Sequence, residues 1–564
     1  MRTSLNAPAS SERRVALVAV DSPWRDPNGT FYSFSYAIEK LRASLRSDPE
    51  LHDVEVLLLD LCTDDPDAFF EALREFRPTL VGLSTYIWSL DVFTGLVERL
   101  RRHDPRVVIV AGGPAARRSV LDLGVYQPLR DRLDAIVPGE GEQTIRDLVR
   151  AHREPDWRER VGGLEIPARG LWRRTRNVER PEIDAYASPY QLGQAPLGKT
   201  GYIETFRGCP IHCAFCQWGE QKADRVHSSD YLARHLEGLR AADVPNVFFV
   251  DAAFNLSPRA FRNLAAAERQ VRALRDKIVH GHIYPTHLEE HHLELFDTFA
   301  QVQASVGIQS FDEEVLARMQ RPFDVDRFER VLKRMRGRLD VDIELIFGLP
   351  GDGPESFWRT LERSIELGDT VKIFRCFALP DALLERADTL QIQFDPRSFR
   401  ITSCEGWDAE QMQREWERVV ARASQFARPI LNDDWVGFVV DGSRTLRGIP
   451  AERTPEVTIS RAPVIDVGTR RALGARIGAA ASGWNLVGVM EERGGLALEL
   501  TTPAGAITLH AEPLVEGRRY FAARDRIAYS HRGAVDRTLA RELLSVIDGV
   551  HADVAPLVAR DALE

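Results

Sequence analysis

The chain has 564 residues, of which 44% are hydrophobic and 28% charged, and its formal net charge is −10. This composition is typical of a globular protein with several domains, and the negative balance disfavours nucleic acid as a partner. No apolar run reaches the ~20 residues that a membrane helix needs, so we expect no membrane partner. Only six cysteines, in a chain without a recognisable export signal, favour a reducing cytoplasmic location.

The first part of the chain alternates short apolar runs with amphipathic stretches. Residues 1–13 are small and polar, which predicts a disordered tail. Between residues 14 and 153, runs rich in β-branched residues are separated by helix-like segments such as DAFFEALREF (67–76). This alternation predicts an α/β domain with a doubly wound, Rossmann-like parallel sheet and helices on both faces. The predicted strands are 15–20, 54–61, 79–86, 106–113 and 135–142.

The carboxyl ends of these predicted strands carry small and hydroxyl residues. Ligands of doubly wound sheets bind at this edge, and glycine there lets the backbone approach a bulky ligand closely. Three neighbouring strand ends have this composition: Ser84 and Thr85; Gly112, Gly113 and Pro114; and Gly139, Glu140 and Gly141. The sequence therefore predicts a ligand site formed by three loops.

A second alternating series follows. Residues 154–198 contain several prolines and the basic run WRRTR (172–176), and we interpret them as a linker. Residues 199–425 predict six strand–helix units, which form a partial barrel open on one side. Residues 426–564 are less regular, and we expect a smaller, mixed α+β domain that caps the barrel. The predicted barrel strands are 201–208, 246–254, 277–284, 302–309, 340–348 and 371–379.

Half of the cysteines lie in one loop after the first barrel strand, RGCPIHCAFCQWGE, which contains Cys209, Cys213 and Cys216. A cubane iron–sulfur cluster takes four ligands, so three thiolates leave one iron open for a small molecule. Zinc, a disulfide and chance are the alternatives. Zinc favours paired C-x2-C motifs, and His212 beside Cys213 is poorly placed to complete a tetrahedron, whereas a disulfide disagrees with a reducing location. The spacing therefore favours a 4Fe–4S cluster.

With these motifs the chain resembles the cobalamin-dependent radical S-adenosylmethionine (SAM) enzymes, and among them the class B methyltransferases. The cysteine loop carries Phe215 just before its last cysteine, and it is followed in order by FFVDAAFN, VGIQSFDEEVLARMQRP, IELIFGLPGD and LPDALLERADTLQIQFDP. Upstream, GLSTYIWS, AGGP and PGEGE resemble the cobalamin-binding domain that precedes the barrel in this family. The resemblance covers residues 14–425.

The resemblance implies three cofactors: a 4Fe–4S cluster held by Cys209, Cys213 and Cys216, SAM at its open iron, and cobalamin in its methylcobalamin form. It places the SAM pocket in the cysteine loop and at barrel strand ends, at Phe215, Trp218, Gly219, Asp251, Asn255, Gln309, Ser310 and Gly348. It places cobalamin against Ser84, Thr85, Tyr86, Ile87, Trp88, Gly112, Gly113, Pro114, Gly139, Glu140 and Gly141. The motifs identify no individual catalytic residue.

One loop departs from the pattern of mutase-type cobalamin domains. Those domains carry Asp-x-His-x-x-Gly after the first strand, and the histidine ligates cobalt from below, whereas here the loop reads DSPWRDPNG (21–29). Either cobalt has no lower ligand from the protein or the domain has lost cobalamin. We favour the first interpretation, with Tyr86, Ile87 and Trp88 forming an apolar wall below the corrin.

The resemblance implies methyl transfer to an unactivated carbon of a small, natural-product-type substrate, with electrons from a donor such as flavodoxin or ferredoxin. Within the same fold, the alternatives are a non-methylating rearrangement or ring contraction, and polar methylation without hydrogen abstraction. From a different class, the chain would be a cobalamin or redox sensor without turnover. A sensor would not need the full series of SAM-pocket motifs, so we favour an enzyme.

Overall fold

The computed structural model describes residues 13–20, 34–51, 54–61, 63–168, 170–196, 199–220, 225–335, 338–440, 456–460, 485–492, 495–502, 505–513, 522–524 and 527–532. Residues 1–12 of the predicted tail and the loop DSPWRDPNG lie outside this part of the chain.

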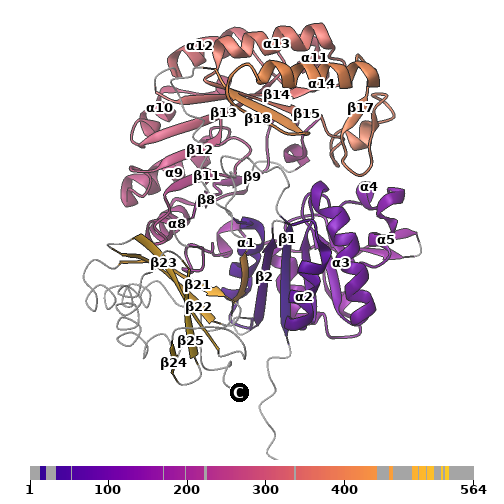
Figure 1. Cartoon of the computed structure of the whole chain (residues 1–564), viewed down its shortest axis with the longest axis vertical. Coiled ribbons are helices and arrows are strands. Elements are labelled where there is room, and N and C mark those ends of the chain that lie inside the picture. Colours follow the sequence, from indigo (N-terminus) through magenta and orange to yellow (C-terminus); the bar gives the residue numbers. More distant parts are fainter. Residues whose placement is uncertain are drawn as a thin grey trace, which may run out of the picture.

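The first domain is built on an eight-stranded sheet with the strand order β20-β2-β1-β3-β4-β5-β6-β7 (Figure 1). Strands β1 to β5 are parallel. Along β1, Val15 and Leu17 belong to one apolar cluster, and Ala16 and Val18 belong to another. Burial on both faces is what a doubly wound sheet requires, so the predicted fold class is confirmed. The parallel strands are β1 (Arg14–Val20), β2 (Glu55–Leu61), β3 (Leu80–Ser84), β4 (Val108–Gly112) and β5 (Ala135–Val137).

Helices cover both faces of this sheet. Helices α1 (Tyr36–Arg46) and α6 (Glu142–Ala151) contact each other and share one apolar cluster, whereas α2 (Pro66–Phe76) and α3 (Leu90–His103) pack in the other. Helix α2 begins cleanly because the Asp65 side chain caps it and proline occupies its first turn. The shorter helices are η1 (Ile87–Ser89), α4 (Arg118–Leu121), η2 (Gly124–Tyr126), α5 (Gln127–Arg130) and α7 (Trp157–Arg160).

Three further strands extend the first sheet, and they change the expected boundaries. Strands β6 (Glu165–Ala168) and β7 (Leu171–Arg174) form an antiparallel hairpin on the edge of β5, inside the segment that we interpreted as a linker. Strand β20 (Glu456–Ser460), from far along the chain, pairs with β2 on the opposite edge. Both additions cover edges whose backbone groups would otherwise lack partners, which is the physical reason for the difference.

The second sheet has the order β18-β19-β15-β14-β13-β12-β11-β8, in which β8 and β11 to β15 are parallel. Figure 1 shows these strands as an arc with helices outside, so the predicted partial, open barrel is confirmed. The six parallel strands are β8 (Gly201–Ile203), β11 (Asn246–Phe249), β12 (Ile278–His282), β13 (Gln301–Gln309), β14 (Asp340–Phe347) and β15 (Thr370–Arg375).

The barrel helices lie on the outer side of these strands (Figure 1). They are α8 (Ser229–Ala241), α9 (Pro258–Val271), α10 (Glu290–Phe296), α11 (Glu313–Arg318), α12 (Val325–Met335), α13 (Pro354–Leu367) and α14 (Ala409–Ala423). Short elements precede or separate these helices in the chain: η3 (Ile183–Ala185), β9 (Phe206–Arg207), η4 (Gln217–Glu220), β10 (Arg225–Val226), η5 (Pro285–His287), η6 (Leu384–Arg386), β16 (Gln393–Phe394) and β17 (Ile401–Ser403).

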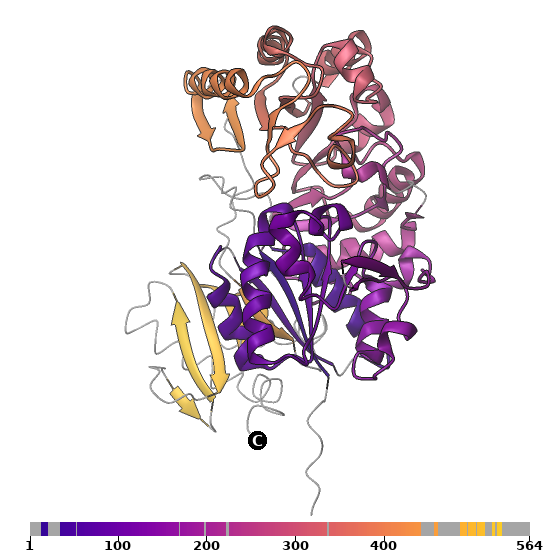
Figure 2. The ribbon, with the colours of Figure 1, turned by 90° about the vertical axis from the view of Figure 1, so that its right-hand side faces the viewer.

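The sheet of the barrel continues past the boundary expected at residue 425. Strands β18 (Ala427–Leu431) and β19 (Trp435–Val439) pair antiparallel at its β15 edge. Five later strands form a separate antiparallel sheet that lies beside the first domain in Figures 1 and 2. That residues 426–564 cap the barrel therefore stays a prediction, and it now concerns the residues of this segment that the structure does not describe. The five strands are β21 (Asn485–Glu492), β22 (Gly495–Thr502), β23 (Gly505–Pro513), β24 (Ala522–Arg524) and β25 (Ile527–Arg532).

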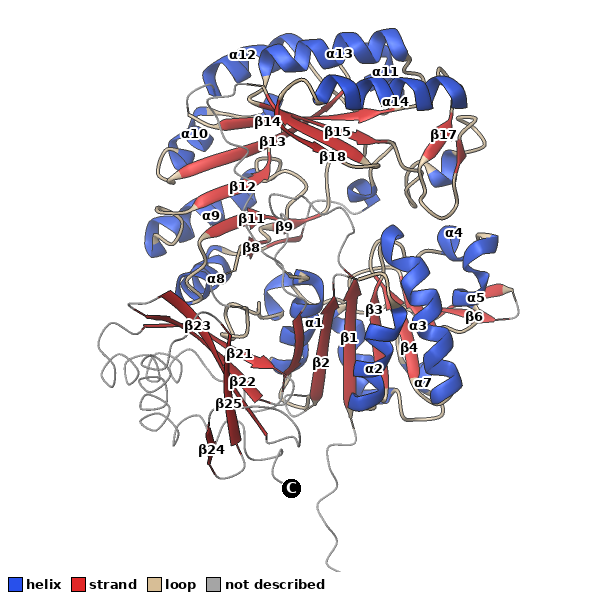
Figure 3. Cartoon of the chain, in the orientation of Figure 1, coloured by secondary structure: helices blue, strands red, loops and turns tan. Residues whose placement is uncertain are grey.

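Figures 2 and 3 show how the two domains are arranged: the strands of the first sheet rise toward the barrel, which lies above their carboxyl ends. The loops predicted to bind a ligand on the first sheet thus face the barrel. Among the described helices, none combines the length and apolar character needed to cross a bilayer.

Candidate functional site

The cysteine loop leaves the first barrel strand and turns at Gly208, whose φ of 92° is a conformation that glycine adopts without strain. The three thiols that follow lie close enough to act on one another. Burial, together with the neighbouring thiols, raises the pKa of Cys216 to about 11 and also raises the pKa of Cys209. Without a bound cation, the thiolate forms of Cys209 and Cys216 are therefore disfavoured, and a cluster would stabilise them.

The surroundings of the thiols suit a thiolate-held cluster. Backbone N–H groups of Ile211 and His212 point at Cys209, and that of Trp218 points at Cys216. Within the described residues, no three His, Cys, Asp or Glu side chains converge as a single metal ion would require. A cubane presents several irons, so its ligands need not converge on one point. Three neighbouring thiols with N–H donors suit a thiolate-held iron–sulfur cluster.

Arg321 is a residue of this site that sequence reasoning missed. Its Nη1 lies 3.5 Å from Cys213 Sγ, and its guanidinium lies over the Tyr284 ring, 5.0 Å from the centroid. Arg321 Nη2 donates to the carbonyl of Gly307, whereas its buried Nε has no hydrogen-bond partner among the described groups. A buried guanidinium with a donor to spare is suited to a carboxylate such as that of SAM. In the sequence, the position of Arg321 in the RMQRP segment is the one signal that could have indicated its part in this site.

Two residues predicted for the SAM pocket have other partners. The Asp251 carboxylate accepts hydrogen bonds from Thr205 N at 2.8 Å, Thr205 Oγ1 at 2.6 Å and Phe206 N at 3.3 Å. Asn255 donates to Tyr284 O and accepts from Tyr284 N, both at 2.9 Å. The geometry gives both side chains a structural part: Asp251 holds the start of the cysteine loop, and Asn255 holds the end of β12.

The remaining predicted SAM residues lie around the mouth of the barrel. Gln309 has a φ of 74° at a register irregularity in β13, and the buried Ser310 Oγ accepts from Asp312 N at 3.1 Å. Gly348 has a φ of 86°, and a Cβ there would lie 3.1 Å from Met412 Cε. In the cysteine loop, Phe215 is buried, Trp218 is 49% exposed, and Gly219 packs tightly against the His212 backbone.

The predicted cobalamin loops after β3 and β4 are joined to each other. Thr85 N and Thr85 Oγ1 both donate to Gly112 O, at 2.7 and 2.6 Å. Gly113 has a φ of 96°, and a Cβ there would lie 2.7 Å from Thr85 O. Only glycine fits this close approach. The two loops and the buried Ser84 therefore form one preorganised edge that ends at Pro114.

Tyr86 and Trp88 form a flat aromatic surface beside this edge. Their rings stack at 4.4 Å with an interplanar angle of 14°, and Trp88 Nε1 donates to Val20 O at 3.2 Å. Ile87, between them in the chain, is also half-buried. The three residues thus come together as an apolar surface at the carboxyl end of β3.

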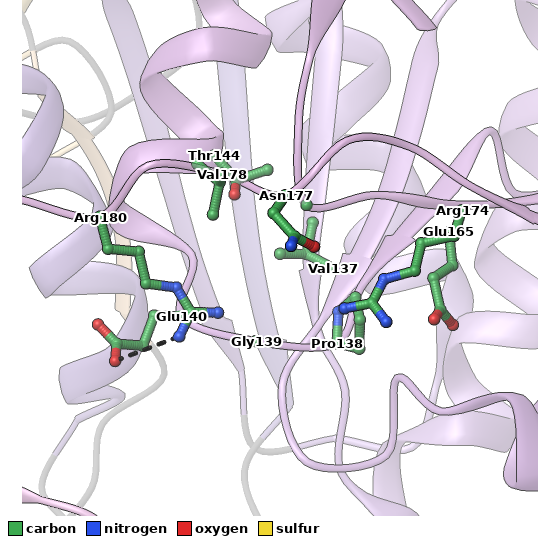
Figure 4. A pocket seen from close by; sticks show the side chains of 11 residues that line it. Val137, Pro138, Gly139, Glu140, Thr144, Glu165, Arg174, Asn177, Val178 and Arg180 are labelled. Carbon is green, nitrogen blue, oxygen red and sulfur yellow. Dashed lines mark ion pairs between the residues drawn. The ribbon is translucent and has the colours of Figure 1, made fainter. Parts of the chain in front are cut away.

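The third predicted loop borders a cavity of about 310 Å³ at the carboxyl end of β5 (Figure 4). Gly141 is the N-cap of α6, so the N-terminus of this helix faces the same region. The lining includes a buried hydroxyl, Thr144 Oγ1, that has no partner among the described groups. Cationic and amide side chains also line it, namely Arg174, Arg180 and Asn177, together with Gly139 and Glu140. A polar ligand group would fit these donors.

The cysteine loop and the cobalamin loops touch. Gln217 Nε2 donates to Pro114 O at 3.1 Å, and Arg207 Nη1 pairs with Glu140 Oε2 at 2.7 Å. Farther along the same face, Tyr126 OH donates to Arg397 O at 3.1 Å. The predicted cluster site and the predicted cobalamin site therefore lie at one interface between the two domains.

Comparisons with known proteins agree with this division. The model of the B12-binding domain matches residues 41–149, and the model of the radical SAM superfamily matches residues 203–363. The chain thus combines a B12-binding domain with a radical SAM domain. These two domains confirm the predicted resemblance to the cobalamin-dependent radical SAM enzymes and the predicted cofactors: cobalamin, SAM and a 4Fe–4S cluster.

Two curated relatives are methyltransferases. The 2-(S-pantetheinyl)-carbapenam-3-carboxylate methyltransferase of Streptantibioticus cattleyicolor is 27% identical over 339 residues, which cover 54% of this chain and 48% of the relative. The cobalamin-dependent radical SAM methyltransferase TokK of Streptomyces tokunonensis is 26% identical over 349 residues, which cover 56% and 49%. The chain therefore spans about half the length of the curated relatives it matches.

Two solved structures share the fold. The methyltransferase TsrM from Kitasatospora setae, with cobalamin and a 4Fe–4S cluster bound, has 18% identity and a TM-score of 0.56, over 72% of this chain and 88% of that one. The cobalamin-dependent radical enzyme OxsB, with aqua-cobalamin and SAM bound, has 14% identity and a TM-score of 0.50, over 83% and 68%. At these identities the likeness concerns the fold alone.

Proposed function

We propose that this protein is a methyltransferase that transfers a methyl group from methylcobalamin to an unactivated carbon of a small, natural-product-type molecule. The observation that carries the proposal is the Gln217–Pro114 contact, because it joins the loop with three thiols to a loop of the B12-binding domain. When bound, the cluster and SAM supply a radical for hydrogen abstraction, and cobalamin supplies the methyl group. A short distance between the two sites lets one substrate meet both chemistries.

The chain's own residues have the following parts in this proposal. Cys209, Cys213 and Cys216 hold the cluster, and Arg321, beside Cys213, binds the carboxylate of SAM. The barrel mouth with Gln309 and Gly348 surrounds the rest of SAM. Burial at the interface excludes water from a reactive radical, and an external donor such as flavodoxin or ferredoxin supplies electrons.

On the cobalamin side, the loops from Ser84 to Trp88, from Gly112 to Pro114 and from Gly139 to Gly141 hold the corrin, and the cavity next to Gly139 takes a polar part of the cofactor. The stacked Tyr86 and Trp88 would supply an apolar surface against the corrin in place of a protein ligand. We therefore expect the electron paramagnetic resonance (EPR) spectrum of bound cob(II)alamin to lack nitrogen splitting from a protein ligand. A clear nitrogen triplet from a side chain would contradict an unligated lower face.

The reaction is tested by product analysis with the reduced, reconstituted protein, deuterated candidate substrates and SAM labelled in its methyl group. We expect S-adenosylhomocysteine, 5′-deoxyadenosine and methylated product together, with substrate deuterium in the 5′-deoxyadenosine. Methylated product without 5′-deoxyadenosine would indicate polar transfer instead. Deoxyadenosine with a rearranged, unmethylated product would contradict the methyltransferase assignment. The Cys213→Ala variant is the control for cluster-dependent chemistry.

A further inference from the structure

The cysteine loop is attached to the B12-binding domain on both of its sides. Arg207 lies two residues before the first cysteine, and Gln217 follows the last cysteine directly. Arg207 pairs with Glu140 and Glu142 at the carboxyl end of β5, and Gln217 donates to Pro114 at the carboxyl end of β4. The two contacts thus flank the three thiols and reach two different loops of the other domain.

The contact of Arg207 belongs to a buried network of charges. The exposed fractions of its side chain and of the Glu140 and Glu142 side chains are only 12%, 8% and 7%. Arg207 Nε also pairs with Glu204 Oε1 at 2.8 Å, and Lys40 Nζ pairs with Glu204 Oε2 at 2.8 Å. Burial alone would raise the pKa of Glu204, but the charges of Arg207 and Lys40 hold it well below its ordinary value. The network therefore keeps its charges and ties β8 to α1 and α6.

The contact of Gln217 ends on a rigid part of the first domain. Pro114 follows Gly113, whose positive φ and close approach to Thr85 fix the loop. Thr85 in turn donates twice to Gly112. On its own side, Gln217 begins the short helix η4 directly after Cys216. A single neutral hydrogen bond therefore joins two preorganised turns, one in each domain.

We propose that Arg207 and Gln217 are positioning residues that set the distance between the iron–sulfur cluster and the corrin. The inference rests on the proposed function, since it needs both cofactors at this interface. Neither side chain has to touch a reacting atom. Together they fix the cysteine loop at its two ends to the loops that hold the corrin, and a misplacement of about 1 Å between reacting groups can cost roughly a hundredfold in rate.

The test compares Gln217→Ala and Arg207→Lys with the wild-type holoprotein. The readout is the dipolar broadening of the cob(II)alamin EPR signal by the reduced cluster, which depends on the separation of the two centres. We expect both variants to keep full iron and cobalamin contents but to show weaker or more heterogeneous broadening. We also expect a loss of roughly tenfold to a hundredfold in methyl transfer. The matched control is Gln413→Ala, because Gln413 is exposed on α14 and donates a hydrogen bond to Glu417 of the same helix.

The variants differ in their risk to folding. Removing the charge of Arg207 would take away the ion-pair partner of the buried Glu142, so the lysine variant keeps the charge and loses only the forked geometry. Gln217→Ala removes one neutral hydrogen bond and leaves the fold intact. Unchanged broadening in both variants, with both cofactors bound, overturns the positioning role and leaves the proposed function standing. A wild-type protein that binds no cobalamin overturns the proposed function as well.

Discussion

The two domains each contain a parallel sheet, but the sheets differ in what their faces bury. On β1, Val15 and Ala16 point to opposite faces and both are fully buried in apolar clusters. On β14, Ile343 belongs to the apolar core of the barrel, whereas the alternate residues Asp342 and Glu344 contact Lys372 and His282. A sheet covered by helices on both faces leaves only the loops at its strand ends for a ligand. An open barrel can also offer a ligand polar side chains from the strands themselves.

The largest expected effect is a loss of the cluster from the barrel without a loss of cobalamin from the first domain. Cys213→Ala removes one of three cluster ligands, so we expect loss of the cluster from the barrel while cobalamin binding by the first domain persists. Iron and sulfide analysis after anaerobic reconstitution, with cobalamin measured by absorbance, checks this. Cys404→Ala removes a buried thiol that donates to the Gly348 carbonyl; this variant is the control and should keep the cluster. A full cluster in the Cys213 variant would contradict the ligand assignment.

A second change tests the polar interior of the barrel. Lys372 Nζ lies 2.8 Å from Asp342 Oδ2, and both side chains are almost inaccessible. Lys372→Met leaves a buried carboxylate without its charge partner, so we expect a loss of about 3–5 kcal/mol in stability, measured by urea unfolding. Lys277→Met, which breaks a pair with the exposed Asp276, should cost at most about 1 kcal/mol. Equal losses of stability in the two variants would contradict the expected difference between a buried ion pair in the barrel and an exposed pair on the surface.

A third change concerns pH and the anchor of the cysteine loop. Burial raises the pKa of Asp251 to about 7, against 3.8 ordinarily. Between these values the unfolded chain loses the proton that the folded chain keeps, so this residue lowers stability as the pH rises from about 4 to about 7, by roughly 3–4 kcal/mol. Asp251→Asn cannot titrate, so thermal unfolding should depend less on pH over that range. An unchanged pH dependence would contradict the raised pKa.

The smallest expected effect concerns the loops of the first sheet. Gly113→Ala places a Cβ 2.7 Å from Thr85 O at a φ of 96°, which costs about 1–2 kcal/mol. We expect cobalamin affinity to fall about tenfold, measured by absorbance titration, with an unchanged cluster content. Gly124→Ala is the control, because a Cβ there meets nothing within 4 Å. If Gly113→Ala also lost the cluster, this would contradict the expectation that the two cofactor sites can be weakened independently.

Local sequence patterns were sufficient for much of the architecture. The continuous apolar runs of the first domain and the strand–helix alternation of the barrel predicted both parallel sheets, because burial imposes a period on each element. The spacing of the three cysteines predicted a cluster, because ligands so near in sequence must lie together in any fold. The glycines at 112 and 113 were predicted to let the backbone approach a ligand, and the structure shows in addition that Gly113 lies against the Thr85 backbone.

Only the tertiary structure decided the pairings between distant segments. Strand β20 joins β2 across about 400 residues, and the hairpin β6–β7 extends a sheet from within a proline-rich segment, since an edge strand accepts any chain of suitable shape. The proximity of Arg321 to Cys213, and of Gln217 to Pro114, likewise depends on how separate elements pack. By itself, then, the sequence predicted the parallel strands of both sheets and proposed the three thiols as cluster ligands, because both follow from neighbouring residues. The interface that brings two cofactor sites together came from packing, which no local pattern encodes.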